Sequence, residues 1–354
     1  MKKFFKSQIT YWNTHVNKRI MPWKGQKDAY KIWLSEIILQ QTRVQQGLSY
    51  YNKFVHLYPQ IFDLAQAPDD EVFKLWEGLG YYSRCKNLLH TARSIVAENG
   101  GIFPKTYDEI IKLKGVGPYT AAAIASFAYD LPFAVVDGNV YRVLSRFFGI
   151  DLPIDSNAGK KLFFELANEC LDKKNAAHYN QAVMDFGAVV CKPQLPTCQA
   201  CVLRKKCLAF KKGLVNQLPV KEKQLLKSNR WFYYFVFRYE DKVLINQRTG
   251  KDIWRQLYEF YVYETFSEIQ WNDKKVDTFL SEQLGIFNYN LTTTSSIYKQ
   301  KLTHQNISGQ FFEIKLEEIP QSLANFSILS LPELSGLAFP RFINQYLEKA
   351  DFQD

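Results

Sequence analysis

The chain has 354 residues, of which 47% are hydrophobic, so it is long enough for two ordinary domains with sizeable cores and is not a disordered chain. Its net charge of +10 favours a polyanionic partner, with nucleic acid ahead of an anionic membrane surface, although a basic protein without such a partner stays an alternative. No apolar run approaches the roughly 20 residues of a membrane span, and the basic start lacks the apolar block of a signal peptide. We therefore expect a cytoplasmic protein with no membrane partner.

The first part of the chain predicts helices. Apolar residues recur at helical spacing in segments 70–80, 139–149 and 179–191, and segment 118–129 is rich in alanine. We expect one mainly α domain over residues 1–210.

The pattern changes after this domain. Residues 211–229 are polar and rich in lysine, which predicts a linker. Residues 230–354 predict a second, α+β domain. Its expected elements are strands at 231–239, 243–248, 297–305 and 310–316, turns at 240–242 and 306–309, and helices at 276–285 and 341–349.

Four cysteines gather near the end of the first domain. Cys191, Cys198, Cys201 and Cys207 have the spacing C-x6-C-x2-C-x5-C. Thiolates this close together ligate either tetrahedral zinc or a cubane 4Fe–4S cluster. A single compact loop with one C-x2-C pair favours the 4Fe–4S cluster, with a structural role. Basic residues 204–206 inside the loop can face phosphates, or can be a solvated charge run.

A glycine pair marks a second candidate site. Gly115 and Gly117 bracket Val116 ahead of a helix that begins near Pro118. Such a turn directs backbone N–H groups outward at a helix N-terminus, where they bind an anion without base preference, and Thr120 can assist. Taken alone, the same pattern fits an ordinary connection between helices.

Two acids stand out by their surroundings. Glu36 lies inside the apolar segment "IWLSEIILQQT", where a buried carboxyl group is costly unless it is paired or useful. Asp137 precedes a helix in "VVDGNV", and a plain N-cap is the structural explanation for it.

These motifs, in this order, resemble a known family. Glu36, "LQQT", "EGLGYYSR", "GVGPYT", "VDGNV" and the cysteine loop resemble the helix–hairpin–helix DNA glycosylases with an iron–sulfur loop, and more narrowly the adenine DNA glycosylases (the MutY family). The resemblance covers about residues 20–210 and, more weakly, 230–354. It implies two helical lobes with a 4Fe–4S loop at 191–207, followed by a Nudix-like domain that recognises 8-oxoguanine.

The resemblance also implies a reaction and a partner. The partner is double-stranded DNA with A:8-oxoguanine or A:G mispairs, bound by a monomer associated with the nucleoid. The runner-up is the sister family, endonuclease III, which attacks oxidised pyrimidines with a lysine two residues after the second hairpin glycine. Tyr119 occupies that position here, and a phenol cannot form an imine, so strand cleavage should be weak or absent. A non-catalytic iron–sulfur protein that binds DNA or RNA is the alternative from another class.

Adenine hydrolysis assigns roles to the two acids. Burial would raise the pKa of Glu36 and keep it a proton donor to the departing base. Asp137, near a helix N-terminus, should stay ionised and face the positive charge of the sugar. Tyr119 and Asn139 match family positions that assist this pair.

The base must leave the duplex to reach these groups. We expect Gln40, Gln41 and Thr42, on the helical turn after Glu36, to bind exposed base edges. Leu39 is a candidate wedge, and Tyr81 resembles the family's intercalating residue, although an aromatic packed on the core is its alternative. Gln181 matches a family position whose glutamine or glutamate contacts the flipped adenine. We expect Trp23 to line the same pocket, and Lys24 follows it where relatives often have arginine.

The second domain retains only "SEQLG" of the Glu-rich Nudix helix, so it should recognise rather than hydrolyse. In the family a Phe-Ser-His loop probes 8-oxoguanine, and the matching residues here are Leu302, Thr303 and His304. An exposed histidine at a strand end is the plain alternative.

Overall fold

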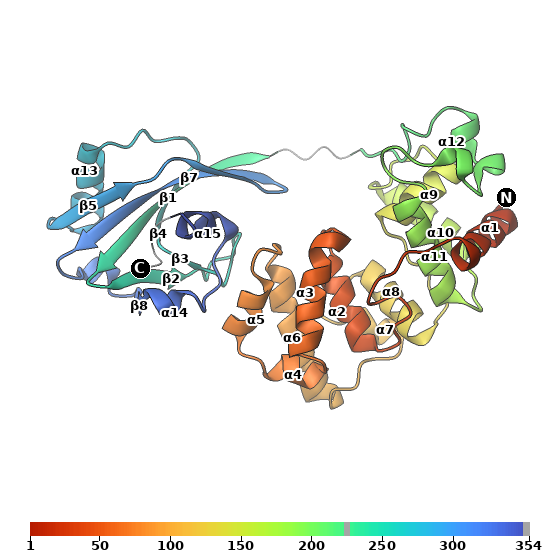
Figure 1. Cartoon of the computed structure of the whole chain (residues 1–354), viewed down its shortest axis with the longest axis horizontal. Coiled ribbons are helices and arrows are strands. Elements are labelled where there is room, and N and C mark those ends of the chain that lie inside the picture. The colour runs from red at the N-terminus through yellow and green to blue at the C-terminus, as the bar shows by residue number, and fades with distance from the viewer. Residues whose placement is uncertain (223–226, 350–354) are drawn as a thin grey trace. The chain divides into compact units, whose positions relative to one another are not determined.

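The protein is described by a computed structural model over residues 1–222 and 227–349, so the expected linker at 211–229 lies partly outside the described residues. The chain forms two compact units (Figure 1). The first comprises residues 1–66 and 87–224, and the second comprises residues 67–86 and 225–354. The boundaries expected at 210 and 230 stay a prediction.

The first unit is helical. Its helices are α1 (Lys2–His15), α2 (Ala29–Leu39), α3 (Val44–Leu57), α4 (Ile61–Gln66), most of α6 (Ser83–Asn99), α7 (Tyr107–Ile110), α8 (Pro118–Tyr129), α9 (Gly138–Phe148), α10 (Asn157–Cys170), α11 (Ala176–Val189) and α12 (Leu208–Lys211), with short 3-10 turns η1 (Cys198–Ala200) and η2 (Arg204–Lys206). Helix α5 (Asp69–Trp76) belongs to the second unit.

These helices pack in two groups (Figure 1). In one group α2 packs against α3 and α8, and α7 against α8. In the other, α1, α10, α11 and α12 pack around α9 over a core that contains Phe5, Phe147, Phe163 and Phe186. Helix α11 also contacts α8 and so joins the groups. The mainly α architecture expected from the sequence is confirmed.

Local sequence sets the helix ends that matter for the site. The Asp28 side chain caps α2 by accepting a hydrogen bond from Tyr30 N, and Asp137 caps α9 by accepting from Val140 N. Gly149 ends α9 in the left-handed conformation that glycine adopts without a penalty. Pro118 begins α8, where its missing N–H costs nothing.

The second unit is built on one mixed sheet. Its described strands are β1 (Ser228–Tyr239), β2 (Lys242–Gln247), β3 (Tyr258–Glu259), β4 (Tyr261–Thr265), β5 (Tyr289–Thr294), β6 (Tyr298–Lys301), β7 (Gln305–Leu316) and β8 (Ser327–Ser330). Strands β1 and β7 run parallel at the centre, with the order β3-β2-β1-β7-β5, and β4, β6 and β8 pair with β1, β7 and β2 respectively.

Side chains alternate between the two faces of the sheet along its central strands, so both faces carry apolar residues. A helix covers each face. On one face Phe235 and Phe312 pack with Leu280 of α13 (Asp273–Leu284). On the other, the Phe311 ring stacks on Tyr346 of α15 (Arg341–Leu347), with ring centroids 4.1 Å apart. The remaining helical pieces are η3 (Gln321–Leu323) and α14 (Leu331–Leu334). The α+β class expected for this domain is confirmed.

One predicted turn is wrong. Residues 306–309, expected to form a turn because of their Asn, Ser and Gly, lie inside β7, and the hairpin turn falls at 302–304 instead. Ile307 is buried, and Gly309 lies where a Cβ atom would come within 2.2 Å of the Phe232 carbonyl oxygen on β1. The glycine therefore serves close strand packing rather than chain reversal. Within the described residues, no helix combines the length and apolar character that a membrane span requires.

Candidate active site

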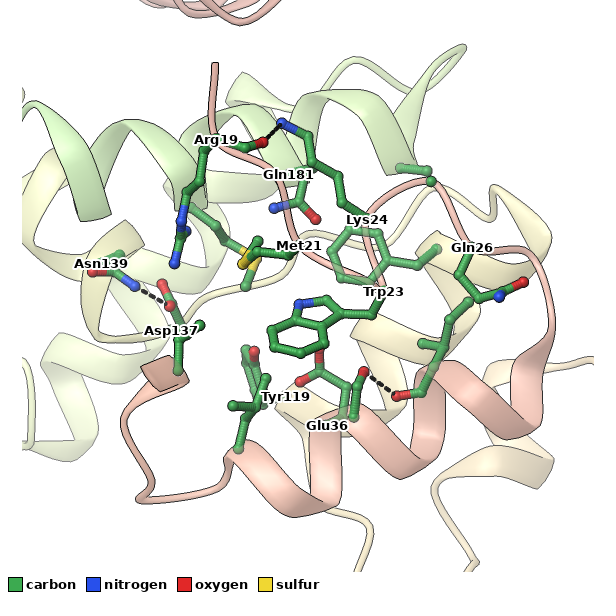
Figure 2. A pocket seen from close by; sticks show the side chains of 18 of the residues that line it. Arg19, Met21, Trp23, Lys24, Gln26, Glu36, Tyr119, Asp137, Asn139 and Gln181 are labelled. Carbon is green, nitrogen blue, oxygen red and sulfur yellow. Dashed lines mark hydrogen bonds between the residues drawn. The ribbon is translucent and has the colours of Figure 1, made fainter. Parts of the chain in front are cut away.

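A cavity of about 720 Å³ lies in the first unit and draws its walls from both helix groups (Figure 2). Residues of α2, α8 and α11 line it, together with segments 19–27 and 136–139. All four expected catalytic residues and half of the expected DNA-binding residues line this one cavity: Trp23, Lys24, Glu36, Leu39, Gln40, Gln41, Thr42, Tyr119, Asp137, Asn139 and Gln181.

Glu36 lies on the buried face of α2 with only 6% of its surface exposed. Burial raises the pKa of Glu36 to about 7; the hydrogen bond from Tyr119 opposes this rise and the negative charge of Asp137 adds to it. The carboxyl group therefore keeps its proton close to neutral pH, whereas an exposed glutamate would lose it. This is the environment of a general acid.

Tyr119, in the first turn of α8, is drawn between Glu36 and Asp137 in Figure 2. Burial, followed by the charges of Glu36 and Asp137, raises the pKa of Tyr119 well above its usual value, so the phenol stays protonated. It donates a hydrogen bond to Glu36. The phenol thus holds one oxygen of that carboxyl group in place.

Asp137 accepts hydrogen bonds at both carboxyl oxygens. Oδ1 accepts from Val140 N at 2.7 Å, and Oδ2 accepts from Asn139 Nδ2 at 2.6 Å. Burial raises the pKa of Asp137, whereas these donors and the charge of Arg142 lower it. Burial outweighs these donors, so the pKa of Asp137 lies above its usual value. The two accepted N–H bonds favour the carboxylate form, and Asp137 both caps α9 and faces the cavity.

Close packing of α9 against α11 fixes this capping group. A Cβ atom on Gly187 would lie 2.6 Å from the Cβ atom of Asn139. Arg142 ties the two helices together by donating to Asn139 Oδ1 at 2.8 Å and to the Gly187 carbonyl oxygen at 2.7 Å. The position of Asn139, and through it of Asp137, follows from this contact.

Sequence reasoning missed a buried group that lies behind the lining residues Gln181, Arg19 and Lys24. Asp185 of α11 is 0% exposed, and its carboxyl group accepts from Gln181, Arg19, Asn17 and Lys24. Arg19 and Lys24 lie 2.8 and 2.9 Å from its oxygens. The i, i+4 spacing from Gln181 was the available signal, but three of the four partners are far away in sequence.

Trp23 packs edge-on against Tyr51, with ring centroids 5.3 Å apart, and its indole is drawn next to Glu36 in Figure 2. Such a ring offers a flat apolar surface to a base.

The segment after Glu36 forms a turn and not the further helical turn that the sequence predicts. Helix α2 ends at Leu39, and Gln41 has a φ of 56°. Thr42 N donates a hydrogen bond to the Leu39 carbonyl oxygen at 3.1 Å, which closes the turn. Helix α3 then folds back against α2 so closely that a Cβ atom on Gly47 would lie 2.8 Å from Leu39 Cδ2. Gln40 donates to the Thr120 hydroxyl at 3.1 Å.

The glycine hairpin connects α7 and α8. Gly115 has a φ of 81°, Gly117 caps α8, and Val116 is buried. Thr120 is only 2% exposed, so its hydroxyl group is not presented at the surface. It accepts the hydrogen bond from Gln40 instead. These hairpin residues do not line the cavity.

Tyr81, Thr303 and His304 belong to the second unit. Tyr81 has a φ of 49° and is 43% exposed, and its ring lies against the Arg84 guanidinium, 5.5 Å from the ring centroid. Its hydroxyl group is hydrogen-bonded to the Thr303 hydroxyl. Thr303 and His304 are exposed in the turn between β6 and β7. The structure therefore brings Tyr81 together with this turn.

The four cysteines line a small cavity of about 30 Å³ beside Arg146 of α9. Arg146 Nη1 lies 3.5 Å from Cys191 Sγ, and its other donors bond the carbonyl oxygens of Lys192, Pro193 and Leu218. Four soft thiols that converge beside a cation fit an anionic thiolate-ligated centre. In the described ranges 1–222 and 227–349, no group of three or more His, Cys, Asp or Glu is arranged to hold a single metal ion.

The comparisons with known proteins agree with this fold. Residues 34–166 match the model of the HhH-GPD superfamily of base excision DNA repair proteins, and residues 233–349 match that of the NUDIX domain. A thermostable thymine-DNA glycosylase, 31% identical, covers 60% of this chain and 97% of its own length with a TM-score of 0.55. An endonuclease III–DNA complex shares the fold at 20% identity, with a TM-score of 0.52, over 60% of this chain and 98% of its own. The first unit is thus a helix–hairpin–helix DNA glycosylase domain.

The curated relatives define the family more narrowly. Adenine DNA glycosylase from Buchnera aphidicola subsp. Baizongia pistaciae is 33% identical over 85% of this chain and 83% of its own length. The enzyme of that name from Buchnera aphidicola subsp. Acyrthosiphon pisum is 31% identical over 94% and 96%, and that from Homo sapiens is 39% identical over 63% and 41%. This chain belongs to the adenine DNA glycosylase family. It is a base excision repair enzyme that acts on DNA.

Proposed function

We propose that this chain removes adenine that is mispaired with 8-oxoguanine or guanine in duplex DNA. The observation that carries the proposal is that a buried Glu36, whose pKa burial raises to about 7, and a helix-capping Asp137 line the same cavity. A cavity of about 720 Å³ has room for a base that has left the duplex. One acid and one carboxylate on either side of a glycosidic bond is the arrangement that this hydrolysis needs.

The reaction assigns one task to each group. Glu36 donates its proton to N7 of the flipped adenine, and the electron pair of the C1′–N9 bond leaves with the base. Asp137 stabilises the oxocarbenium-like sugar by its charge. Water then adds to C1′ and loses a proton. Tyr119 orients Glu36, and Asn139 orients Asp137.

Tyr119 also bears on the type of reaction. A phenol cannot form a Schiff base with the sugar, so the proposed enzyme is monofunctional and leaves the DNA strand intact. Borohydride trapping on damaged duplex checks this, because an efficient covalent adduct would contradict it.

DNA binding would involve both units. Backbone N–H groups at residues 115–117 are candidates for a phosphate, since the hairpin leads into the N-terminus of α8. Leu39, Gln40, Gln41 and Thr42 form a tight turn at the cavity, where they can fill the space that the flipped base leaves.

In the second unit, Tyr81 is the candidate intercalating residue, and Thr303 and His304 are candidates to contact 8-oxoguanine. The hydroxyl bond between Tyr81 and Thr303 supports a joint role. His304→Ala should then reduce the preference for 8-oxoguanine over guanine, and unchanged discrimination would argue against it.

Cys191, Cys198, Cys201 and Cys207 would hold a 4Fe–4S cluster, which would crosslink the loop rigidly. The support is the convergence of the four thiols on one cavity beside Arg146. Basic residues of η2 (Arg204–Lys206) are exposed on the same loop and suit phosphates. Iron analysis and the visible absorbance of the purified protein test this, and colourless protein with zinc would contradict it.

The central experiment measures adenine release from A:8-oxoguanine and A:G duplexes, with duplexes that lack adenine as controls. The Glu36→Gln variant should bind the same duplex while its base release falls by a factor of about 100 or more, as expected on loss of a general acid. Release at the wild-type rate would refute the assignment of Glu36.

A further inference from the structure

The amide of Gln181 can face the cavity in two ways, and they would recognise different bases. With its carbonyl oxygen inward, it accepts a hydrogen bond; with its NH2 group inward, it donates one. Adenine has a donating amino group at C6, whereas hypoxanthine has an accepting oxygen there. The orientation of this amide therefore bears on which purine the cavity accepts.

We propose that Asp185 is the positioning residue that fixes this orientation, so that Gln181 presents an acceptor to the 6-amino group of adenine. The inference rests on the function proposed above. Gln181 Nε2 donates to Asp185 Oδ1 at 3.0 Å. A carboxylate only accepts, so the NH2 side of the amide must face it. The oxygen then lies on the side of the amide away from Asp185, and the side chain lines the cavity, as Figure 2 shows. We infer that this oxygen is the atom presented to the base.

Asp185 is itself held firmly. It is fully buried, and Arg19 and Lys24 bond to different oxygens of its carboxyl group at 2.8 and 2.9 Å. Asn17 donates to Oδ2 at 2.8 Å. With two donors on each oxygen, the carboxylate cannot rotate to offer Gln181 a different partner, so the amide has one favoured orientation.

This orientation also suits the reaction. Once Glu36 has protonated the base, the 6-amino group becomes a stronger donor, because the ring withdraws electrons from it. A hydrogen bond to Gln181 Oε1 then strengthens on the way to the transition state, and that is where an interaction increases the rate. An NH2 group in the same place would oppose the charge.

The test compares single-turnover release of three bases from otherwise identical duplexes opposite 8-oxoguanine. They are adenine, purine without a 6-substituent, and hypoxanthine. In Asp185→Asn we expect the adenine rate to fall about tenfold, the value of roughly one hydrogen bond, while the purine rate stays within about twofold. The adenine-to-hypoxanthine ratio should fall by at least as much. An equal fall for all three bases would mean that Asp185 is only part of the scaffold, and would overturn the proposal.

A charge exchange provides the second variant. Gln181→Glu combined with Asp185→Asn keeps one carboxylate beside Arg19 and Lys24, and both oxygens of the introduced carboxylate accept whichever way the group rotates. It should therefore recover the wild-type adenine-to-purine ratio within about threefold. Gln181→Met, which has no acceptor, should lose the ratio, and adding Asp185→Asn to it should change the ratio no further.

These outcomes stay decisive if Asp185→Asn alone does not fold, as judged by thermal unfolding. A charge exchange that loses the ratio, or a further loss when Asp185→Asn is added to Gln181→Met, would overturn the proposal. Wild-type protein that releases no adenine would overturn the proposed function as well. Wild-type release combined with an unchanged ratio in Asp185→Asn would overturn only the role of Asp185.

Discussion

The buried acid should make the folded protein sensitive to pH in a way that one isosteric substitution removes. In the folded state the pKa of Glu36 rises from 4.5 to about 7 because of burial. Between these two values the unfolded chain releases the proton while the folded chain keeps it, so stability falls as the pH rises through this window. The free energy of unfolding is not reduced at pH values below the pKa of the unfolded chain, and it is fully reduced at pH values above the pKa of the folded protein.

The size of this effect follows from the same shift. At roughly 1.4 kcal/mol per pKa unit, a rise from 4.5 to about 7 corresponds to about 3 kcal/mol above pH 7. Glu36→Gln keeps the shape, and its side-chain oxygen can still accept from Tyr119, but it carries no charge. The variant should therefore match the wild type near pH 4.5 and exceed it by about 3 kcal/mol at pH 8.5.

Thermal unfolding from pH 4.5 to 8.5, followed by circular dichroism, measures this difference. For a domain of this size the gain corresponds to about 6–12 °C in the unfolding temperature at pH 8.5. Glu165→Gln, at an exposed position on α10, is the matched control and should show no pH-dependent gain. A Glu36→Gln gain that is equal at both ends of the range, or absent at pH 8.5, would refute the argument that burial raises this pKa.

Three further predictions concern the reaction and the backbone. Single-turnover adenine release should fall as the pH rises through about 7, because Glu36 loses its proton, and a flat profile from pH 5 to 9 would contradict the acid role. Gly115→Ala should weaken duplex binding and lower stability by about 1–3 kcal/mol, because φ is 81° and a Cβ atom would lie 2.8 Å from Asn87 Cβ. Gly117→Ala, whose Cβ atom would meet nothing within 4 Å, is the control for stability, and equal stability losses would contradict the reasoning. Gly309→Ala should destabilise the second unit in denaturant unfolding, since its Cβ would meet a neighbouring strand at 2.2 Å; wild-type stability would refute this.

The two acids could be predicted from sequence because their signals are local. An acid inside an apolar helix predicts a buried carboxyl group, and an aspartate before a helix predicts a cap. The structure adds that Glu36 and Asp137 share a cavity, which spacing alone does not determine.

The failed predictions share a physical cause. The turn after Leu39 depends on how α3 packs against α2, and the strand at 306–309 depends on a partner strand more than 70 residues away. Asp185 was missed because three of its partners come from residues 17–24, over 160 positions earlier. Tertiary contacts decided each case, and local propensity gave no warning.

The contact between Gly187 and Asn139 has a genetic consequence. Asn139, which donates to Asp137, occupies the space that a side chain at position 187 would need. Replacing this glycine with alanine would displace Asn139 and thereby the anion that it steadies. Such a variant would retain Glu36 and Asp137, yet we expect it to lose activity as a substitution of one of these acids would. A survey limited to the proposed catalytic residues would therefore count an allele that encodes alanine at position 187 as neutral.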